Sequence, residues 1–277
     1  MNFDNITIIG RDNRIIKAKQ LLVQNGINVF HITDRNDLSK LPVCDITVLP
    51  IPYKDASGKI KGSDITLHDI SSLLNTENYI ILGKADSEII SLADRIKFKF
   101  CDINTDMRFK KLNAIPTAEA ALSIAMQNTP YTLNDHNVLV CGYGCIAQCL
   151  AKISVSLGCN VTVAARKSSD RIDARYKGCT AVDFCRLKEV VGSQNIIFNT
   201  CPAPILTKDV LAYVQRECMI IDLASHPGGC DFEFAKDNGI NAGLYLSLPD
   251  IYSPQTSGEN FYKIIVDIIE DLKNERS

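Results

Sequence analysis

A short segment near the middle of the chain places the tightest limit on its fold. Residues 138–147 read VLVCGYGCIA, an apolar strand that runs directly into the pattern G-x-G-x-x-A. An apolar-periodic segment follows over 146–157, and a second apolar stretch follows over 161–165. Strand, glycine turn, helix and strand in this order are typical of a dinucleotide-binding βαβ unit. The sequence therefore predicts a parallel α/β domain built around this turn.

Each small residue of the turn has a separate task in such a unit. Gly142 permits the tight turn, Gly144 lets backbone N–H groups approach a pyrophosphate, and Ala147 lets the helix pack closely on the strand. Free N–H groups and the helix dipole favour an anion at a helix N-terminus. We therefore expect the pyrophosphate over this turn, beside Cys145 and Ile146. The alternative is a Rossmann-type unit whose glycines serve packing alone.

The end of the second strand indicates which dinucleotide is bound. A ribose with a free 2′-OH is usually held by Asp or Glu about twenty residues beyond the first glycine. Here the segment 163–168 reads VAARKS and contains no acid. Beyond Ala165, Arg166 can bind a 2′-phosphate bidentately, Lys167 adds a charge, and Ser168 can donate a hydrogen bond. The segment favours NADP over NAD, and the alternative is a solvated loop with two exposed cations.

The composition argues against several classes of function. The 30 basic and 32 acidic residues nearly balance, which gives no support for general binding to nucleic acid or an anionic membrane. No apolar run is long enough to cross a bilayer, and the first residues lack the layout of a secretory signal. The 11 cysteines include no C-x-x-C pair and no zinc-finger spacing, which is typical of a reducing compartment. We therefore expect a cytoplasmic protein without a bound metal.

Two cysteines need separate comment because they lie at the nucleotide turn. Cys145 and Cys149 are four residues apart on the expected helix and so share a face. A metal or redox role for this pair is the weaker interpretation, since a third and a fourth ligand are missing.

Strands and helices alternate in both halves of the chain, which predicts two doubly wound parallel-sheet domains of the α/β class. In the first half we expect strands over 6–9, 29–32, 46–49, 79–82 and 97–101, a helix over 14–24 and a long loop over 50–62. In the second half we expect further strands over 195–199 and 219–223. Pro116 indicates a helix start between the halves, and the apolar pattern over 261–272 predicts an amphipathic helix that packs back on one domain. The expected division is an N-terminal substrate or partner domain (1–113), a Rossmann domain (114–255) and a C-terminal helix (256–277).

Two further loops should face the cofactor, because ligands collect at the carboxyl ends of strands in such sheets. The loop after 195–199 supplies four candidate cofactor contacts, Asn199, Thr200, Cys201 and Pro202. The loop after 219–223 contains Ser225 and His226, followed by a proline and paired glycines. An unperturbed imidazole titrates near neutrality, which makes His226 a candidate for proton transfer. The alternative is a loop histidine that caps a backbone carbonyl.

These segments together resemble the family formed by the A subunit of dipicolinate synthase, over nearly the whole chain. The resemblance rests on IPTAE (115–119), VLVCGYG (138–144), DLASHPGG (222–229) with the following DF (231–232), and LPDIYSPQTSG (248–258). It implies NADP-dependent oxidation of a dihydrodipicolinate-type cyclic imine dicarboxylate to dipicolinate in spore formation. It also implies a flavoprotein-like dipicolinate synthase B subunit as partner, and we expect a homo-oligomer. Thr117 and Glu119, together with Ser225 and His226, would border the substrate.

The chain departs from the family pattern at several positions. Cys145 stands where the family usually has Arg, and Ala147 stands where it tends to have Gly. Near the end, Gln255 replaces a Lys, and Asp250, Ser253 and Ser257 also differ. If that lysine binds a substrate carboxylate, Gln255 weakens anion recognition or changes the substrate. The alternative to a catalytic role is therefore that of a diverged NADP(H)-binding partner or sensor with little catalysis of its own.

Overall fold

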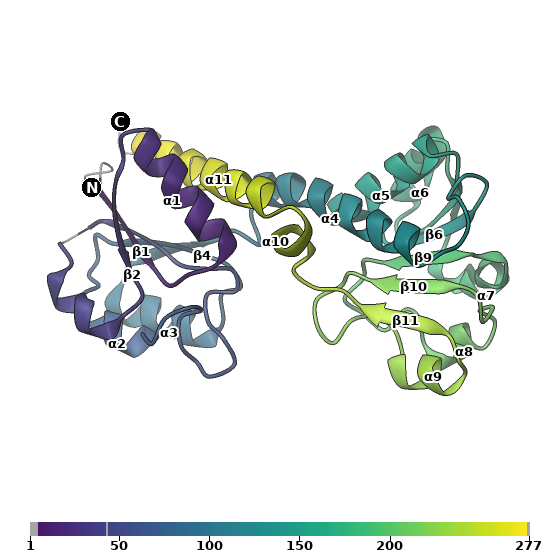
Figure 1. The fold of residues 1–277 in the computed structure, drawn as a ribbon, viewed down its shortest axis with the longest axis horizontal. Coiled ribbons are helices and arrows are strands. Elements are labelled where there is room, and N and C mark those ends of the chain that lie inside the picture. The colour runs from purple at the N-terminus through teal and green to yellow at the C-terminus, as the bar shows by residue number, and fades with distance from the viewer. Residues whose placement is uncertain (1–4, 43, 276–277) are drawn as a thin grey trace. The chain divides into compact units, whose positions relative to one another are not determined.

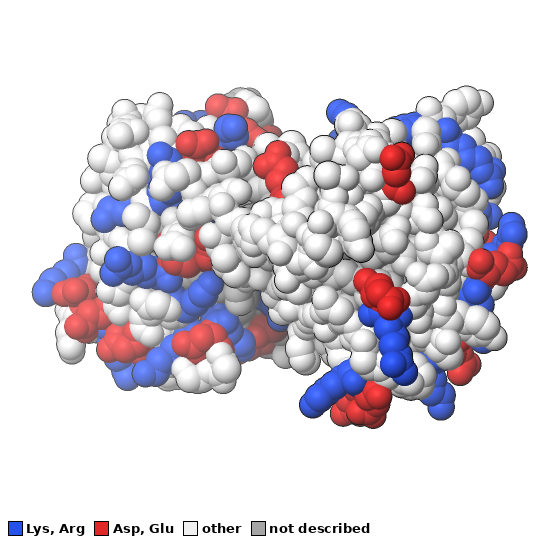
Figure 2. All heavy atoms as spheres, turned by 45° about the vertical axis from the view of Figure 1, so that its right-hand side comes forward, with Lys and Arg blue, Asp and Glu red and all other residues white. Residues whose placement is uncertain are grey.

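The computed structural model describes residues 5–42 and 44–275 and divides into two compact units. Unit 1 combines residues 1–112 with 253–277, and unit 2 consists of residues 113–252. Each unit is a parallel sheet covered by helices on both faces, which confirms the predicted fold class (Figure 1). No helix of the described residues has both the length and the apolar character needed to cross a membrane. Positive and negative side chains are interspersed on the face that Figure 2 shows.

Unit 1 is a five-stranded sheet in the order β2-β1-β3-β4-β5. Its strands are β1 (Asn5–Ile9), β2 (Asn28–Ile32), β3 (Ile46–Val48), β4 (Tyr79–Leu82) and β5 (Lys99–Asp102). Its helices are α1 (Asn13–Gln24), α2 (Leu67–Ser71), α3 (Ser87–Ile96) and α11 (Pro254–Asn274). Figure 1 shows α1 and α11 on one face of the sheet and α2 and α3 on the other. The long loop after β3 carries two isolated antiparallel bridges, Lys54 to Ile60 and Lys59 to Thr66.

The C-terminal helix α11 packs along α1, as the amphipathic pattern predicts. Ile15 and Leu22 of α1 share a buried cluster with Phe261, Ile264 and Ile265 of α11. Burying each of these side chains is worth roughly 1.5–3 kcal/mol, so the last helix is an integral part of the unit 1 core. The helix begins at Pro254, two residues before the expected boundary at 256.

Unit 2 is a six-stranded sheet in the order β11-β10-β9-β6-β7-β8. Its strands are β6 (Asn137–Cys141), β7 (Asn160–Ala164), β8 (Thr180–Val182), β9 (Ile196–Asn199), β10 (Met219–Asp222) and β11 (Asn241–Leu244). Its longer helices are α5 (Cys145–Ser156), α6 (Ser168–Tyr176) and α9 (Phe232–Asp237), and its short ones are α7 (Leu187–Val190), α8 (Lys208–Leu211) and α10 (Leu248–Tyr252). Counted from β6, this is the characteristic Rossmann order, which reverses between β6 and β9. The sequence analysis did not anticipate the short edge strands β8 and β11.

The helix start expected at Pro116 is wrong. Pro116 lies inside α4 (Met107–Gln127), a helix that runs through the boundary between the two units. A proline in a helix cannot donate to the carbonyl four residues earlier, which here belongs to Leu112. The Asn260 side chain of α11 donates to that carbonyl instead, at 3.0 Å. A tertiary contact that the local sequence does not reveal thus satisfies the group that Pro116 leaves open.

Another expected boundary also shifts. The strand expected over 97–101 is β5, at Lys99–Asp102. Lys97 instead adopts the left-handed conformation, with φ of 71°, and ends α3.

Candidate functional site

The glycine turn after β6 has the geometry that the sequence predicts for its first glycine. Gly142 has φ of +104°, a backbone conformation that residues with a side chain rarely adopt. A Cβ at this position would collide with the Thr200 hydroxyl and lie 3.0 Å from the Cys201 sulfur. The turn after β6 and the loop after β9 therefore meet at the point where the strand order reverses. In a sheet of this order, that point is where a dinucleotide binds.

The second glycine of the turn leaves space for a ligand. Gly144 is the N-cap of α5, it is exposed, and a Cβ at this position would have nothing within 4 Å. No side chain of the described residues caps this helix end. The first amides of a helix have no partner within the helix, so they are available to an anion. Cys145 and Ile146, both half-buried, begin the helix at this point, and the arrangement fits a pyrophosphate.

A buried polar network fixes the two loops beyond β9 and β10. The Asn199 side chain donates to the Asp222 carboxylate at 2.9 Å, and both residues are fully buried. Asp222 also accepts hydrogen bonds from the backbone N–H groups of Ala224 (2.9 Å) and Gly229 (2.7 Å). Asn199 accepts from the backbone N–H of Cys201 at 3.1 Å. The network shapes the loop that carries the predicted contacts Asn199 to Pro202.

Glycines let the two loops approach each other closely. A Cβ on Gly229 would lie 2.6 Å from the Asn199 side-chain nitrogen and 2.6 Å from the Cys201 carbonyl oxygen. Paired glycines in the sequence indicate such an approach, and Gly229 makes it to a neighbouring segment. Sequence reasoning missed Asp222 as a site residue, although an acid at the end of an apolar strand was a usable signal.

The turn after β7 presents the two expected cations to solvent. Arg166, Lys167 and Ser168 are exposed, while Ala165 is buried. Burial raises the pKa of the Cys201 thiol, the Asp222 charge adds to this shift, and the positive charge of Arg166 opposes it. Arg166 therefore lies within electrostatic reach of the loop after β9. This is the side of the glycine turn on which a 2′-phosphate is held in such folds.

Arg171, which the sequence analysis did not single out, holds this turn in shape. Its Nη1 donates at 2.7 Å to the carbonyls of Ala165 and Arg166, and at 2.7 Å to the Asp183 carboxylate. The Arg171 side chain is mostly buried, so its guanidinium is held among these three acceptors and does not extend into water. The cations at 166 and 167 thus project from a turn that is fixed from behind.

Tyr143 links the glycine turn to helix α6. Its hydroxyl donates to the Asp173 carboxylate at 2.7 Å, and Lys177 binds the same oxygen at 2.6 Å. Lys177 also lies 5.7 Å from the centre of the Tyr143 ring. Hydrogen bonds from Lys177 and Tyr143 hold the pKa of Asp173 below its usual value. The residue between the two glycines therefore has a structural task that the motif alone does not specify.

The four expected catalytic residues all lie in unit 2 but differ in exposure. Thr117 is buried in α4, and its hydroxyl donates to the Asn113 carbonyl at 2.6 Å. Glu119, Ser225 and His226 are exposed. Ser225 accepts through its carbonyl a hydrogen bond from the Gly228 N–H at 2.9 Å. Among the described residues, no hydrogen bond or ion pair joins the α4 pair to the pair in the loop after β10.

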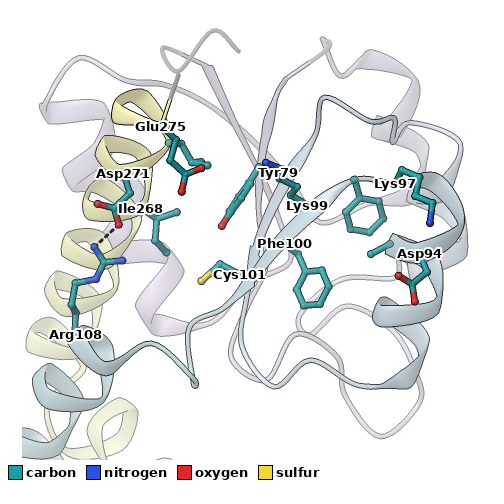
Figure 3. A pocket seen from close by; sticks show the side chains of 13 residues that line it. Tyr79, Asp94, Lys97, Lys99, Phe100, Cys101, Arg108, Ile268, Asp271 and Glu275 are labelled. Carbon is teal, nitrogen blue, oxygen red and sulfur yellow. Dashed lines mark hydrogen bonds and ion pairs between the residues drawn. The ribbon is translucent and has the colours of Figure 1, made fainter. Parts of the chain in front are cut away.

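An open groove of about 570 Å³ in unit 1 contains none of the expected site residues. It lies beside the edge strand β5 and is lined by Tyr79, Phe100 and Ile268 among others (Figure 3). Its three cations are matched by three acids, and Arg108 already binds Asp271 at 2.6 Å. In the described part of the chain, no three His, Cys, Asp or Glu side chains are grouped to hold a metal ion.

Comparison with known proteins identifies the class first. Residues 110–225 match the model of the D-isomer specific 2-hydroxyacid dehydrogenase, NAD binding domain. The matched segment contains the glycine turn, the cationic turn and the loop after β9. The Rossmann strand order and this match define an NAD(P)-dependent oxidoreductase with a nicotinamide dinucleotide as cofactor.

The particular family follows from full-length relatives. The A subunit of dipicolinate synthase from Bacillus subtilis (strain 168) is 32% identical over 288 residues, which cover 98% of this chain and 97% of that protein. The crystal structure of the Bacillus subtilis protein has a TM-score of 0.91 at 26% identity and covers 99% of this chain and 98% of its own. The structure of the Bacillus halodurans protein gives 0.88 at 26%, over 95% and 97%. The chain belongs to the family of dipicolinate synthase A subunits, which confirms the resemblance seen in the sequence.

Proposed function

We propose that the chain oxidises a dihydrodipicolinate-type cyclic imine dicarboxylate to dipicolinate, with NADP⁺ as the hydride acceptor. The observation that carries the proposal is the match to the A subunit of dipicolinate synthase across 98% of the chain. Loss of a hydride and a proton converts a dihydro ring into an aromatic pyridine, so the reaction balances with one nicotinamide. The setting that we propose is the cytoplasm of a spore-forming cell.

The preference for NADP rests on the turn after β7. Arg166 and Lys167 are exposed there, and the turn has no acid to hold a free ribose 2′-OH or to repel a 2′-phosphate. Arg171 fixes the backbone carbonyls of Ala165 and Arg166 behind the two cations. A guanidinium on a fixed turn can bind a phosphate bidentately with little further loss of freedom.

The chain's own residues supply binding and proton transfer around the cofactor. The N-terminus of α5 at Gly144 would bind the pyrophosphate, and the loop from Asn199 to Pro202 would line the cofactor beyond the turn. The nicotinamide, when bound, accepts the hydride of the substrate ring. His226 would remove the departing proton, with Ser225 hydrogen-bonded to the substrate beside it. Glu119 and Thr117 complete the proposed site; the Thr117 hydroxyl, bound to a helix carbonyl, would contribute through its accepting lone pairs.

The proposed assembly follows from the relatives. Because they are named as the A subunit of an enzyme, a companion is implied. We propose a flavoprotein-like B subunit of dipicolinate synthase as this companion, together with self-association of the present chain.

A second candidate function is that of an NADP(H)-binding partner or sensor. It is favoured by Cys145 as the first residue of α5 and by an exposed Gln255 in the first turn of α11. The family usually has cations at these two positions, where they would help a catalytic protein to bind anions.

Cofactor reduction by the purified chain distinguishes the two functions. Freshly generated dihydrodipicolinate is added with NADP⁺ or NAD⁺, in the presence and absence of the companion protein, and the absorbance of the reduced nicotinamide is followed. The proposal predicts substrate-dependent reduction that is faster with NADP⁺. Tight NADP(H) binding without any reduction in either condition would support the sensor function instead.

A further inference from the structure

The reversal of strand order in unit 1 brings two loops together at one edge of its sheet. The order β2-β1-β3-β4-β5 reverses between β1 and β3, and ligands of open α/β sheets bind at the carboxyl ends of the strands at such a point. The turn 10–12 follows β1, and the long loop 50–62 follows β3. The proposed function has so far used neither segment.

The two segments are fastened to each other through their backbones. The N–H of Arg11 donates to the carbonyl of Lys61 at 2.9 Å, and the N–H of Lys61 donates to the carbonyl of Tyr53 at 3.0 Å. Gly10 has φ of +89°, and a Cβ there would lie 2.5 Å from the Lys61 carbonyl oxygen. Gly62 has φ of +72°, and a Cβ there would collide with Arg11. Arg11 and Lys61 therefore project from adjacent, fixed backbone positions.

A buried carboxylate lies next to these positions. Asp12 accepts a hydrogen bond from the Ile15 N–H at 2.9 Å through Oδ1 and so caps α1. Its Oδ2 lies 3.7 Å from Arg14 Nε and 3.9 Å from Lys61 Nζ. Arg14, also buried, donates through Nη2 to the Ile51 carbonyl at 3.0 Å. Because a carboxylate occupies the N-terminus of α1, this end of unit 1 disfavours a phosphate there, in contrast to the open N-terminus of α5.

Two cationic ends at this edge have no hydrogen-bond partner among the residues that the structure describes. The Arg11 side chain is exposed and lines an open groove of about 640 Å³ together with His31 and Thr33. The Lys61 side chain is 32% exposed, and its distance of 3.9 Å from Asp12 is too long for a hydrogen bond. Asp12 attracts Lys61 to this edge without using its N–H donors. A planar guanidinium and an ammonium on neighbouring positions match a carboxylate group.

We propose that Arg11 and Lys61 bind a carboxylate group of the substrate, with Asp12 as the residue that positions Lys61. The inference rests on the proposed function for the identity of that substrate, a cyclic dicarboxylate. The groove beside β5 offers no comparable site, since its cations and acids are balanced and its arginine is already bound. Unit 1 thereby acquires a specific role in recognising the substrate's charge.

The test measures binding of pyridine-2,6-dicarboxylate to the full-length chain by calorimetry. The variants are Arg11→Met and Lys61→Met, with Lys59→Met as a matched control because Lys59 is exposed on the same loop. Each charge-removing change at 11 and 61 should weaken binding about tenfold, as expected for loss of a charge-assisted hydrogen bond. Lys59→Met should bind as the parent does, and Lys61→Arg should retain more affinity than Lys61→Met. With dihydrodipicolinate, KM should rise while kcat changes little.

The possible outcomes separate this inference from the proposed function. If the parent binds the dicarboxylate and both Met variants bind it equally well, Arg11 and Lys61 are structural and the inference is overturned, whatever their melting temperatures. If the parent neither binds the dicarboxylate nor oxidises its dihydro form, the substrate of the proposed function is overturned, and this inference with it. Arg11 is exposed, so Arg11→Met reports on binding even if a change at Lys61 disturbs folding.

Discussion

Asn199 and Asp222 form a fully buried pair, joined by a hydrogen bond of 2.9 Å between the amide nitrogen and the carboxylate. The pair connects the ends of β9 and β10, and the carboxylate also holds the backbone of the loop that contains Ser225 and His226. A buried carboxylate is tolerated only when its lone pairs are satisfied, and three donors satisfy this one. The pair therefore fixes both the cofactor loop and the candidate catalytic loop.

Asn199→Ala should destabilise unit 2 by about 2–4 kcal/mol, because it removes one donor and leaves a buried charge less well satisfied. Thermal unfolding, followed together with NADP titration, measures both effects. Asp237→Asn on the exposed end of α9 is the control and should be nearly neutral. An Asn199→Ala variant as stable as the parent would show that water replaces the amide without cost.

Alanine at the two glycines of the turn should give opposite results. Gly142→Ala should destabilise the protein, because the positive φ and the contacts with Thr200 and Cys201 leave no place for a methyl group. Gly144→Ala should fold normally, since its φ is −76° and the space beside it is open, but it should bind NADP more weakly. Gly144→Val should abolish binding. Circular dichroism melts and cofactor titrations separate the two effects, and normal NADP affinity of Gly144→Val would move the phosphates away from this turn.

Arg166→Ala should weaken NADP binding by about 2 kcal/mol and leave NAD binding nearly unchanged, because only NADP carries the 2′-phosphate. Arg171→Met should reduce the same preference indirectly, by freeing the carbonyls of Ala165 and Arg166. Fluorescence titration of both reduced cofactors with each variant measures the preference, and exposed Arg216→Met is the control. Equal affinity of the parent for NAD and NADP would contradict the assignment of NADP.

Tyr143→Phe should raise the pKa of Asp173 towards its usual value, because one of the two hydrogen bonds to the carboxylate is lost. A carboxyl group whose pKa is lowered by folding stabilises the fold above its usual pKa, and the contribution disappears as the pH falls through the lowered value. The parent should therefore keep the Tyr143 link to α6 at neutral pH and lose it only in strong acid. Carboxyl NMR titration checks the shift, with exposed Tyr176→Phe as the control. An unchanged titration of Asp173 would show that Lys177 alone sets it.

His226→Lys should abolish turnover while leaving NADP binding intact, since a protonated lysine is a poor base near neutral pH. For the parent, kcat/KM should rise with pH as the base loses its proton. If His226 instead holds a substrate carboxylate as imidazolium, the lysine variant keeps its turnover, and apparent substrate affinity of the parent falls as the pH rises. Stopped-flow assays over a pH series distinguish these results.

The sequence by itself determined the class of fold, the position of the cofactor turn and the family. Apolar runs separated by helical periodicity are local signals, and the spacing of Gly142, Gly144 and Ala147 reports a backbone path that larger residues do not allow. The absence of an acid after β7 is likewise visible without a structure. The amphipathic pattern of the last helix predicted that it packs back, because a buried stripe needs an apolar partner.

Only the tertiary structure decided which distant groups satisfy one another. Pro116 has the local signature of a helix start, yet the helix continues because Asn260, 148 residues beyond Leu112, donates to the carbonyl that the proline leaves open. The roles of Arg171, Asp222 and the pair Arg11 and Lys61 likewise depend on loops that meet at strand ends. Strand order and loop contact are set by packing between segments far apart in sequence, so no local pattern of residues encodes them directly.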